Sequence, residues 1–166
     1  MHSPVNLRHA RLLNFLHCLL SLYVEQRKLG EVHREVFAVR LASRQVFLPD
    51  VCYFTHEQVP RLEPTFAPFA PTLVVEAISP ATADMDTGPK FAAYEEHGVQ
   101  EYWVLDPDAL SHRFFRREGE RLVEFAREDE VIAAQSIAGF WVRRAWLNPD
   151  KLPEVAPCLA EILAGR

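Results

Sequence analysis

Apolar residues near the start of the chain recur at helical spacing. Between Arg8 and about Leu29 the apolar positions are Leu12, Leu13, Leu16, Leu19, Leu20 and Tyr23. Residues three and four apart lie on one side of an α-helix, so this spacing predicts an amphipathic helix. The apolar stripe is broad, which indicates that the helix packs against a sheet. We expect Gly30 to end the helix.

The segments that follow are typical of strands. We expect one strand over residues 31–41, a tight turn over 42–45 and a second strand over 46–54. Pro49 lies inside the second strand and has no N–H to donate, which predicts an edge position or a bulge there. Residues 55–70 hold three prolines and no clear period, so they are expected to form a loop.

The middle of the chain predicts two strands joined by a helix. Residues 72–78 are almost continuously apolar, as expected of a strand that is covered on both faces. A helix is predicted from about residue 87 to 97, with Asp86 or Thr87 as its N-cap. Residues 102–106 predict another buried strand. Two buried strands connected by a helix imply a parallel crossover.

The last third of the chain predicts a hairpin of residues 112–117 and 122–125, an apolar stretch over 138–146 and a short helix over 158–163. Taken together, the pattern predicts an α/β fold in which one mixed sheet carries helices. A chain of 166 residues can bury a full core, so we expect a single domain over residues 1–166.

Composition narrows the class of protein. Hydrophobic residues make up 49% and charged residues 25% of the chain, which is ordinary for a globular protein. No apolar run has transmembrane length. The three cysteines, Cys18, Cys52 and Cys158, have no metal-ligand spacing, so we expect reduced thiols in a cytoplasmic protein. The seven histidines form no pair at zinc-site spacing.

The net charge of −5 argues mildly against nucleic acid as a partner, because proteins that bind phosphates usually carry a basic surface. One basic stretch is present between residues 113 and 121, with Arg113, Arg116, Arg117 and Arg121. It is either a nucleic-acid contact or an exposed, solvated strand and turn.

Two acids stand in apolar, strand-like surroundings. Asp50 follows Pro49 in the predicted second strand, and Glu76 interrupts the apolar run 72–78. A buried carboxylate is costly unless it is paired or bound to a metal. The carboxyl end of a central strand is also where ligands bind in open α/β sheets. Alternatively, Asp50 is a strand-edge acid that faces water, and Glu76 is paired structurally with an arginine.

Lys90 is the candidate cation for the same site, because it lies about one turn into the predicted crossover helix. Asp50, Glu76 and the main-chain carbonyl of Ala77 could hold Mg²⁺ or Mn²⁺. Lys90 could then stabilise the charge on a phosphoryl group during attack on a phosphodiester. Alternatively, it forms a helix-surface pair with Asp86, four residues earlier.

These residues resemble the PD-(D/E)XK nuclease superfamily. More closely, the chain resembles the Uma-like bacterial family of predicted restriction endonucleases within that superfamily. The segments that carry the resemblance are residues 47–51, 71–80, 86–90 with Tyr94, and 98–107, and a weaker likeness extends to residues 8–10 and 136–140.

The resemblance implies a restriction-endonuclease-like fold, in which helices flank a mixed β-sheet. It also implies that Asp50 and Glu76 bind a divalent metal and that a lysine completes the catalytic site on DNA. The usual Glu-x-Lys motif of the superfamily would put that lysine at position 78, where this chain has Ile78. In the resembling family the ammonium comes from the helix, which here means Lys90.

Two classes of function remain open. The first is a Mg²⁺- or Mn²⁺-dependent DNA endonuclease, which we expect to be a homodimer because double-strand cleavage needs two sites. The second is a catalytically inactive protein of the same fold that binds nucleic acid or a protein partner. The presence of Asp50, Glu76 and Lys90 favours the first class, whereas the acidic net charge and Ile78 favour the second.

Overall fold

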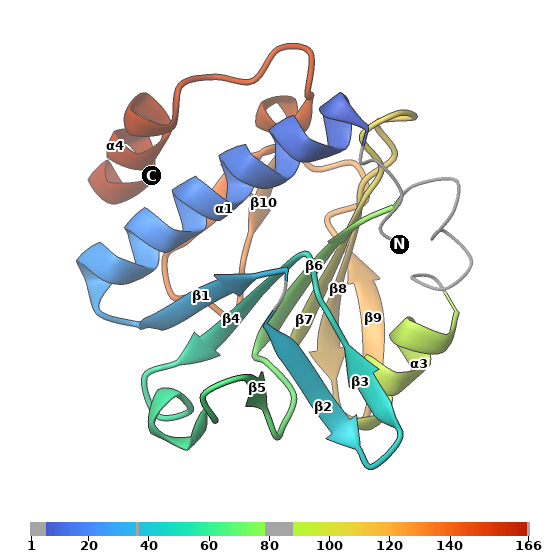
Figure 1. The fold of residues 1–166 in the computed structure, drawn as a ribbon. Helices are drawn as coiled ribbons and strands as arrows, with labels where there is room; N and C mark the ends of the chain where they lie inside the picture. Colours follow the sequence, from blue (N-terminus) through green and yellow to red (C-terminus); the bar gives the residue numbers. More distant parts are fainter. Residues whose placement is uncertain (1–5, 36, 79–87, 166) are drawn as a thin grey trace.

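The computed structural model describes residues 6–35, 37–78 and 88–165 (Figure 1). The helices are α1 (Leu7–Arg27), α3 (Pro89–Glu96) and α4 (Val155–Ala164), with short 3-10 helices η1 (Val59–Arg61) and η2 (Arg144–Leu147). The strands are β1 (Gly30–Arg34), β2 (Ala38–Ala42), β3 (Gln45–Phe47), β4 (Val51–Thr55), β5 (Phe66–Ala67), β6 (Leu73–Ala77), β7 (Glu101–Leu105), β8 (Arg113–Glu118), β9 (Arg121–Phe125), β10 (Val131–Ala133) and β11 (Trp141–Arg143).

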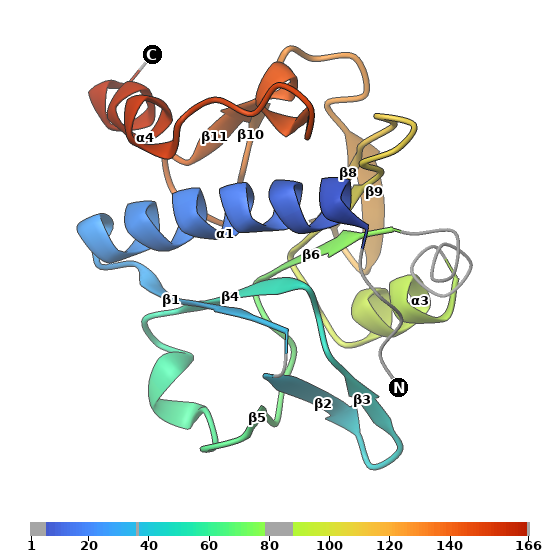
Figure 2. The ribbon, with the colours of Figure 1, turned by 45° about the horizontal axis from the view of Figure 1, so that its top comes forward.

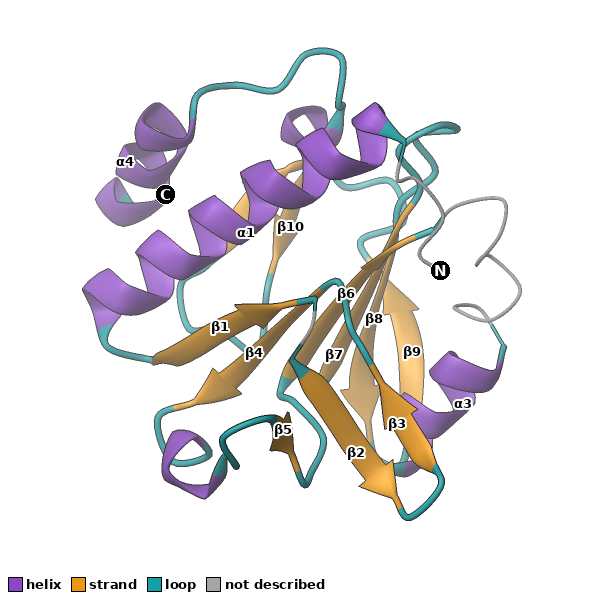
Figure 3. Ribbon diagram, viewed as in Figure 1, coloured by secondary structure: helices purple, strands orange, loops and turns teal. Residues whose placement is uncertain are grey.

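A six-stranded mixed sheet forms the centre of the molecule, with the order β1-β4-β6-β7-β8-β9. Strands β6 and β7 are parallel, and the other neighbours in this sheet are antiparallel. Two small sheets, β3-β2-β5 and β10-β11, accompany it (Figure 3). Helices flank the central sheet, so the predicted fold class is confirmed. The sequence did not separate the two small sheets from the large one.

Helix α1 is sandwiched between two layers. Figure 2 shows the central sheet on one side of α1, and α4 with β10 and β11 on the other. The helix begins at Asn6, whose side chain accepts a hydrogen bond from the Arg8 N–H at 3.0 Å and so caps the first turn. The larger core gathers around α1, and its large, fully buried members include Leu12, Leu16, Leu19, Leu20, Tyr23, Trp103, Phe114 and Phe140.

The opposite face of the sheet carries α3 and the β3-β2-β5 sheet (Figure 2). A second core lies under α3 and contains Val74, Tyr94, Val99, Tyr102, Val104, Phe115 and Leu122. Strand β6 therefore contributes to both faces: Leu73, Val75 and Ala77 belong to the first core, and Val74 belongs to the second. This alternation follows from the two-residue period of a strand, and it explains why 72–78 reads as a continuous apolar run.

Several predicted elements are confirmed. The helix over 8–29, the parallel connection between two buried strands and the hairpin near residues 112–125 all occur close to the expected bounds. The short C-terminal helix is longer than predicted, because α4 begins at Val155. The crossover helix α3 starts later than predicted, and its N-cap is Gly88. The two residues predicted as N-cap, Asp86 and Thr87, lie outside the described residues.

Two predicted strands are wrong as single elements. Residues 31–41 divide into β1, which pairs with β4, and β2, which belongs to the small sheet. Residues 46–54 likewise divide into β3 and β4, and the break falls at Leu48, Pro49 and Asp50. Pro49 cannot donate to a ladder, so the chain leaves one sheet there and enters the other. Residues 55–70 are not wholly a loop either, since they contain η1 and β5.

Gly30 does not end α1 as predicted. The C-cap is Lys28, which adopts the left-handed conformation with φ of 54°. Gly30 is instead the first residue of β1, with φ of 148°. A Cβ at this position would lie 2.0 Å from the carbonyl oxygen of Phe54 on β4. Glycine is therefore required by the close approach of β1 to β4.

None of the helices in the described part of the chain has the length and apolar character that a membrane span requires.

The fold predicts a pH-dependent stability through His112, which is 7% exposed. Its Nδ1 accepts a hydrogen bond from the Asp106 N–H at 3.2 Å. Burial, and then the charge of Arg144, lower the pKa of His112 to about 4. Between that value and the ordinary pKa of about 6.5, the unfolded chain binds more protons than the folded one. Stability therefore falls as the pH falls through this window.

We expect His112 to account for a loss of about 2 kcal/mol in the free energy of unfolding between pH 7.5 and pH 5.0. Urea unfolding at the two pH values would measure it, and His112→Asn should make the difference between them smaller by about that amount. His56→Asn, at an exposed histidine, serves as the control. An equal pH dependence in His112→Asn and the unmutated protein would contradict the prediction.

Candidate active site

Glu76 is a carboxylate in the middle of the central sheet. It lies on β6 next to Val104 of β7, and its side chain is 3% exposed. The two-residue period puts it on the same face as Val74, toward α3. The sequence prediction that this acid is buried near the end of a covered strand agrees with this position.

Two residues of α3 meet the same oxygen of Glu76. The Lys90 Nζ lies 3.1 Å from Glu76 Oε1, and the Tyr94 hydroxyl donates a hydrogen bond to Oε1 at 3.1 Å. Lys90 and Tyr94 are four residues apart, so they lie one above the other on one side of the helix. Burial, and then the negative charge of Glu76, raise the pKa of Tyr94 well above its usual value. The tyrosine therefore stays protonated and keeps donating.

Lys90 was predicted to lie either at Glu76 or in a surface pair with Asp86. Its ammonium points at Glu76, and its side chain is only 16% exposed. Asp86 lies outside the described residues. Position 78, where the superfamily motif would have a lysine, holds Ile78, which packs against the second core. The cation at Glu76 is thus supplied by the helix instead of the strand.

Asp50 closes the ladder between β4 and β6. The last paired residues are Val51 and Val75, and one step beyond them Asp50 Oδ2 accepts a hydrogen bond from the Ala77 N–H at 2.7 Å. A side-chain oxygen thus replaces the backbone carbonyl that would continue the ladder. The N–H and C=O of a strand residue point to the same side, so the carbonyl of Ala77 also faces the strand that follows Asp50.

His9 is a neighbour of Asp50 to which the sequence analysis assigned no role. Its Nε2 lies 3.8 Å from Asp50 Oδ2, and its side chain is 13% exposed. A signal was present, because His9 lies three and four residues before Leu12 and Leu13 on the buried stripe of α1. A histidine at the end of an apolar helix face is too common a feature to identify a site without the fold.

The hairpin β8–β9 fixes the far end of α3. Arg117 donates hydrogen bonds to the carbonyl oxygens of Tyr94, Glu95 and Val99. A guanidinium at the C-terminal end of a helix also interacts favourably with the helix dipole. The Glu95 side chain accepts a hydrogen bond from the Leu122 N–H at 2.8 Å. These contacts hold α3 against the sheet and so set where Lys90 and Tyr94 stand.

The other arginines of the basic stretch 113–121 are engaged with acids. Arg113 pairs with Glu124 at 3.1 Å, Arg116 with Glu118 at 2.9 Å and Arg121 with Glu95 at 3.1 Å. The side chain of Arg121 is 78% exposed. This pairing favours the expected alternative of a solvated hairpin over an open basic surface.

The donor set near Glu76 suits a hard divalent cation. Asp50 directly precedes β4, Glu76 lies on β6, and each is one residue beyond the Val51–Val75 register pair; the Ala77 carbonyl points to the side of β6 on which Asp50 lies. Mg²⁺ is usually held by one or two carboxylates and retains several waters, so these residues fit it. No cluster of three or more histidine, cysteine, aspartate or glutamate side chains with metal-binding geometry occurs among residues 6–35, 37–78 and 88–165.

A cavity of about 520 Å³ lies away from the Asp50–Glu76 site. It is bordered by residues of the β7–β8 connection, the segment before β10, and η2, including His112 and Arg144. It shares no lining residue with the Asp50–Glu76 site.

The chain matches known proteins at the level of family and fold. Residues 1–148 match the Uma2 family, which carries the description "Putative restriction endonuclease". The chain belongs to the Uma2 family. No curated protein sequence matches the chain.

A solved structure has the same fold as this Uma2 chain. It is the crystal structure of "a putative nuclease belonging to DUF820" from Anabaena variabilis ATCC 29413. The TM-score is 0.68 at 16% identity, and the likeness covers 97% of this chain and 84% of the other. At this identity the likeness supports the fold alone, and it agrees with the nuclease-like architecture of the Uma2 family.

The buried contact between Lys90 and Glu76 predicts a coupled effect on stability. Lys90→Met would leave the Glu76 carboxylate buried without its lysine partner, and breaking a buried ion pair in this way costs about 3 kcal/mol. Adding Glu76→Gln removes the negative charge and should restore most of the free energy of unfolding. Urea unfolding of the two single variants and the double variant gives the coupling free energy.

The matched control is Lys151→Met, at an exposed lysine, which should change stability by less than about 0.5 kcal/mol. A double variant as unstable as Lys90→Met alone would show that the two charges do not stabilise one another.

Proposed function

We propose that this Uma2 protein is a DNA endonuclease that depends on Mg²⁺ or Mn²⁺ and hydrolyses phosphodiester bonds. The observation that carries the proposal is the contact between Lys90 on α3 and Glu76 on β6, at 3.1 Å in a buried site. It brings together the two residue types that the Glu-x-Lys motif of the superfamily would supply from two positions of one strand. The family match and the nuclease-like fold support the same reaction class.

Asp50, Glu76 and the carbonyl of Ala77 are the proposed metal ligands. A divalent cation bound there would lower the pKa of a coordinated water and neutralise charge on the phosphate. Asp50 and Ala77 are held by their mutual hydrogen bond, so these two ligands are oriented before any ion arrives. Preorganised ligands need little rearrangement on binding.

Lys90 and Tyr94 have separate tasks in the proposed site. The Lys90 ammonium supplies positive charge beside the carboxylates, where a negatively charged transition state would develop. The Tyr94 hydroxyl fixes the rotation of the Glu76 carboxylate by donating to Oε1. Since Tyr94 is fully buried, a water molecule cannot take the place of its hydroxyl as the hydrogen-bond donor to Glu76. We also propose that the chain acts as a single domain over residues 1–166 and as a homodimer, because cutting both strands needs two sites.

One set of observations favours a second candidate, a catalytically inactive protein of the same fold that binds nucleic acid or a protein partner. The chain has a net charge of −5, and the arginines of the hairpin β8–β9 are paired with acids or carbonyl oxygens. A hairpin whose arginines are already paired offers less electrostatic attraction for DNA than free cations would.

The two candidate functions predict different results in a plasmid-nicking assay. The purified protein should nick supercoiled plasmid in Mg²⁺ or Mn²⁺ at low salt, and excess EDTA should stop the reaction. Asp50→Asn and Glu76→Gln should each abolish nicking, because each weakens the hold on the ion. Lys90→Met should lower the rate by about 100-fold or more. Electron paramagnetic resonance of free Mn²⁺ measures ion binding independently of cleavage.

Glu96→Gln is the matched control, since Glu96 is an exposed acid on the same helix as Lys90. It should nick as fast as the unmutated protein. If the unmutated protein binds Mn²⁺ but neither nicks nor cuts DNA, the inactive-module candidate replaces the endonuclease.

A further inference from the structure

A small cavity lies beside the proposed active site on the same face of the sheet. It measures about 220 Å³, and its lining includes Phe91, Val104, Arg113 and Phe115. Val104 is the register partner of Glu76 on the neighbouring strand, and the backbones of neighbouring strands lie about 5 Å apart. Phe91 follows Lys90 directly on α3. The lining of the cavity therefore includes the sequence neighbour of Lys90 and the register partner of Glu76.

Two of the residues that line this cavity are aromatic. The rings of Phe91 and Phe115 meet edge to face with centroids 4.9 Å apart. Tyr102, fully buried behind them, contacts both rings at 6.0 Å and 6.4 Å. The two phenylalanine rings are thus held by packing, and they form a rigid wall. Apolar walls of this kind favour a planar ring over a flexible or highly charged group.

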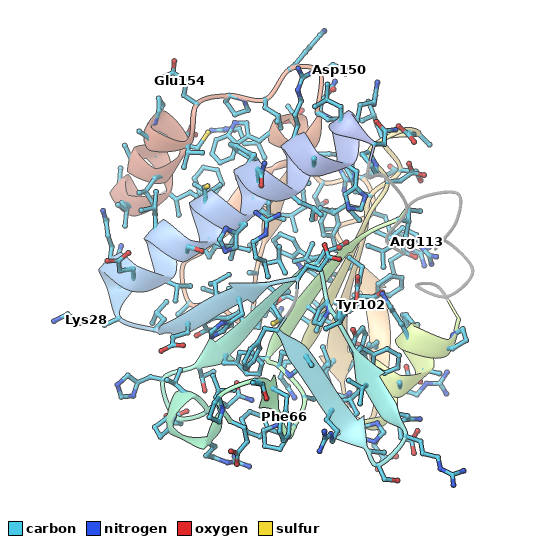
Figure 4. The ribbon with its side chains drawn as sticks, in the orientation of Figure 1. Lys28, Phe66, Tyr102, Arg113, Asp150 and Glu154 are labelled. Atoms are coloured by element: carbon cyan, nitrogen blue, oxygen red, sulfur yellow. The ribbon has the colours of Figure 1, made fainter. Side chains whose placement is uncertain are left out.

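Arg113 adds a third flat surface. Its guanidinium carbon lies 4.8 Å from the centre of the Phe115 ring. Glu124 holds it in a two-point contact, with Nε to Oε1 at 3.2 Å and Nη2 to Oε2 at 3.1 Å. The side chain is still 47% exposed. The guanidinium is therefore held over the Phe115 ring by a side chain that stays accessible. Figure 4 shows Arg113 and Tyr102 on the side of the sheet that faces α3.

Size limits what the cavity can take. Pockets that enclose drug-sized ligands measure roughly 300–1,000 Å³, so about 220 Å³ suits one ring system and excludes a whole nucleotide. Aromatic rings and arginine planes are the surfaces on which proteins stack unpaired bases. Stacking of this kind does not need a net basic surface, which agrees with the net charge of −5.

We propose that this cavity binds an unstacked nucleobase next to the phosphate that is cleaved. The proposal rests on the proposed endonuclease function and specifies its substrate: a DNA strand with at least one unpaired nucleotide at the site of cleavage. A base between Phe91 and Arg113 would direct its own sugar and phosphate toward Lys90 and Glu76. A fully paired duplex would first have to unstack a base, which has a free-energy cost, so it is the weaker substrate.

Binding without metal tests the cavity apart from cleavage. The probe is a 15-nucleotide oligothymidylate with one central 2-aminopurine, single-stranded or paired with its complement, in EDTA at low salt. The 2-aminopurine fluorescence should change on binding of the single strand and much less with the duplex. Arg113→Lys keeps the charge but removes the planar surface, and Phe91→Leu keeps the apolar volume but removes the ring. Each should weaken single-strand binding by about 5- to 150-fold and abolish the fluorescence change.

The matched control is Arg116→Lys. Arg116 lies on the same strand, is paired with Glu118 and lies over the ring of Phe125, but it projects from the opposite face of the sheet. It should leave single-strand binding unchanged. Circular dichroism melting establishes that each variant is folded, and Arg113→Lys, at a half-exposed residue, serves as the decisive one should Phe91→Leu unfold.

The outcomes separate the two proposals. Normal plasmid nicking together with unchanged single-strand binding in Arg113→Lys would overturn the base-binding cavity and leave the endonuclease intact. Weakened binding in Arg113→Lys, with the unmutated protein unable to nick, would support the cavity and overturn the endonuclease. Equal losses in Arg113→Lys and Arg116→Lys would overturn the cavity, because the loss would then not depend on which face of the sheet carries the arginine. Absence of DNA binding would overturn it too.

Discussion

The structure depends on a carboxylate that is buried in a strand covered on both faces. Glu76 would be costly to bury alone, and the fold compensates by bringing Lys90 and Tyr94 to one of its oxygens. This requirement fixes the rotation of α3 about its axis, since both residues must face β6. It also fixes the distance of α3 from the sheet. Helix α3 therefore supplies the contacts that offset the free-energy cost of burying the Glu76 carboxylate.

The proposed site joins elements that are far apart in the chain. Asp50 comes from the break between two sheets, Glu76 from the central strand, Lys90 from the crossover helix and His9 from the first helix. Each has a structural contact besides any role in catalysis: Asp50 ends the β4–β6 ladder, and Lys90 neutralises a buried charge. Variants at these positions therefore have to be read with stability and activity measured side by side.

Sequence alone predicted the parts of the fold that depend on the local spacing of apolar residues. The helix over 8–29, the buried strands around 72–78 and 102–106 and the hairpin β8–β9 follow from spacing of apolar residues. It failed where the chain changes sheets, between β1 and β2 and at Pro49, because strand residues look alike whichever sheet they join. Asp50, Glu76 and Lys90 could be singled out as acids and a lysine in unusual places. Their contacts, and those of His9 and Tyr94, depend on tertiary packing that no local pattern encodes.

Arg117 has a consequence for how the basic stretch 113–121 should be interpreted. Its guanidinium binds three carbonyl oxygens at the end of α3, and α3 carries Lys90 toward Glu76. Losing Arg117 would loosen the helix and displace the ammonium from the acid without removing any group that touches DNA. If each arginine were substituted in turn, the loss of activity in the Arg117 variant would look like the loss of a contact with a DNA phosphate. A basic residue of this stretch can therefore govern the geometry of the proposed site while acting only as a support for the helix.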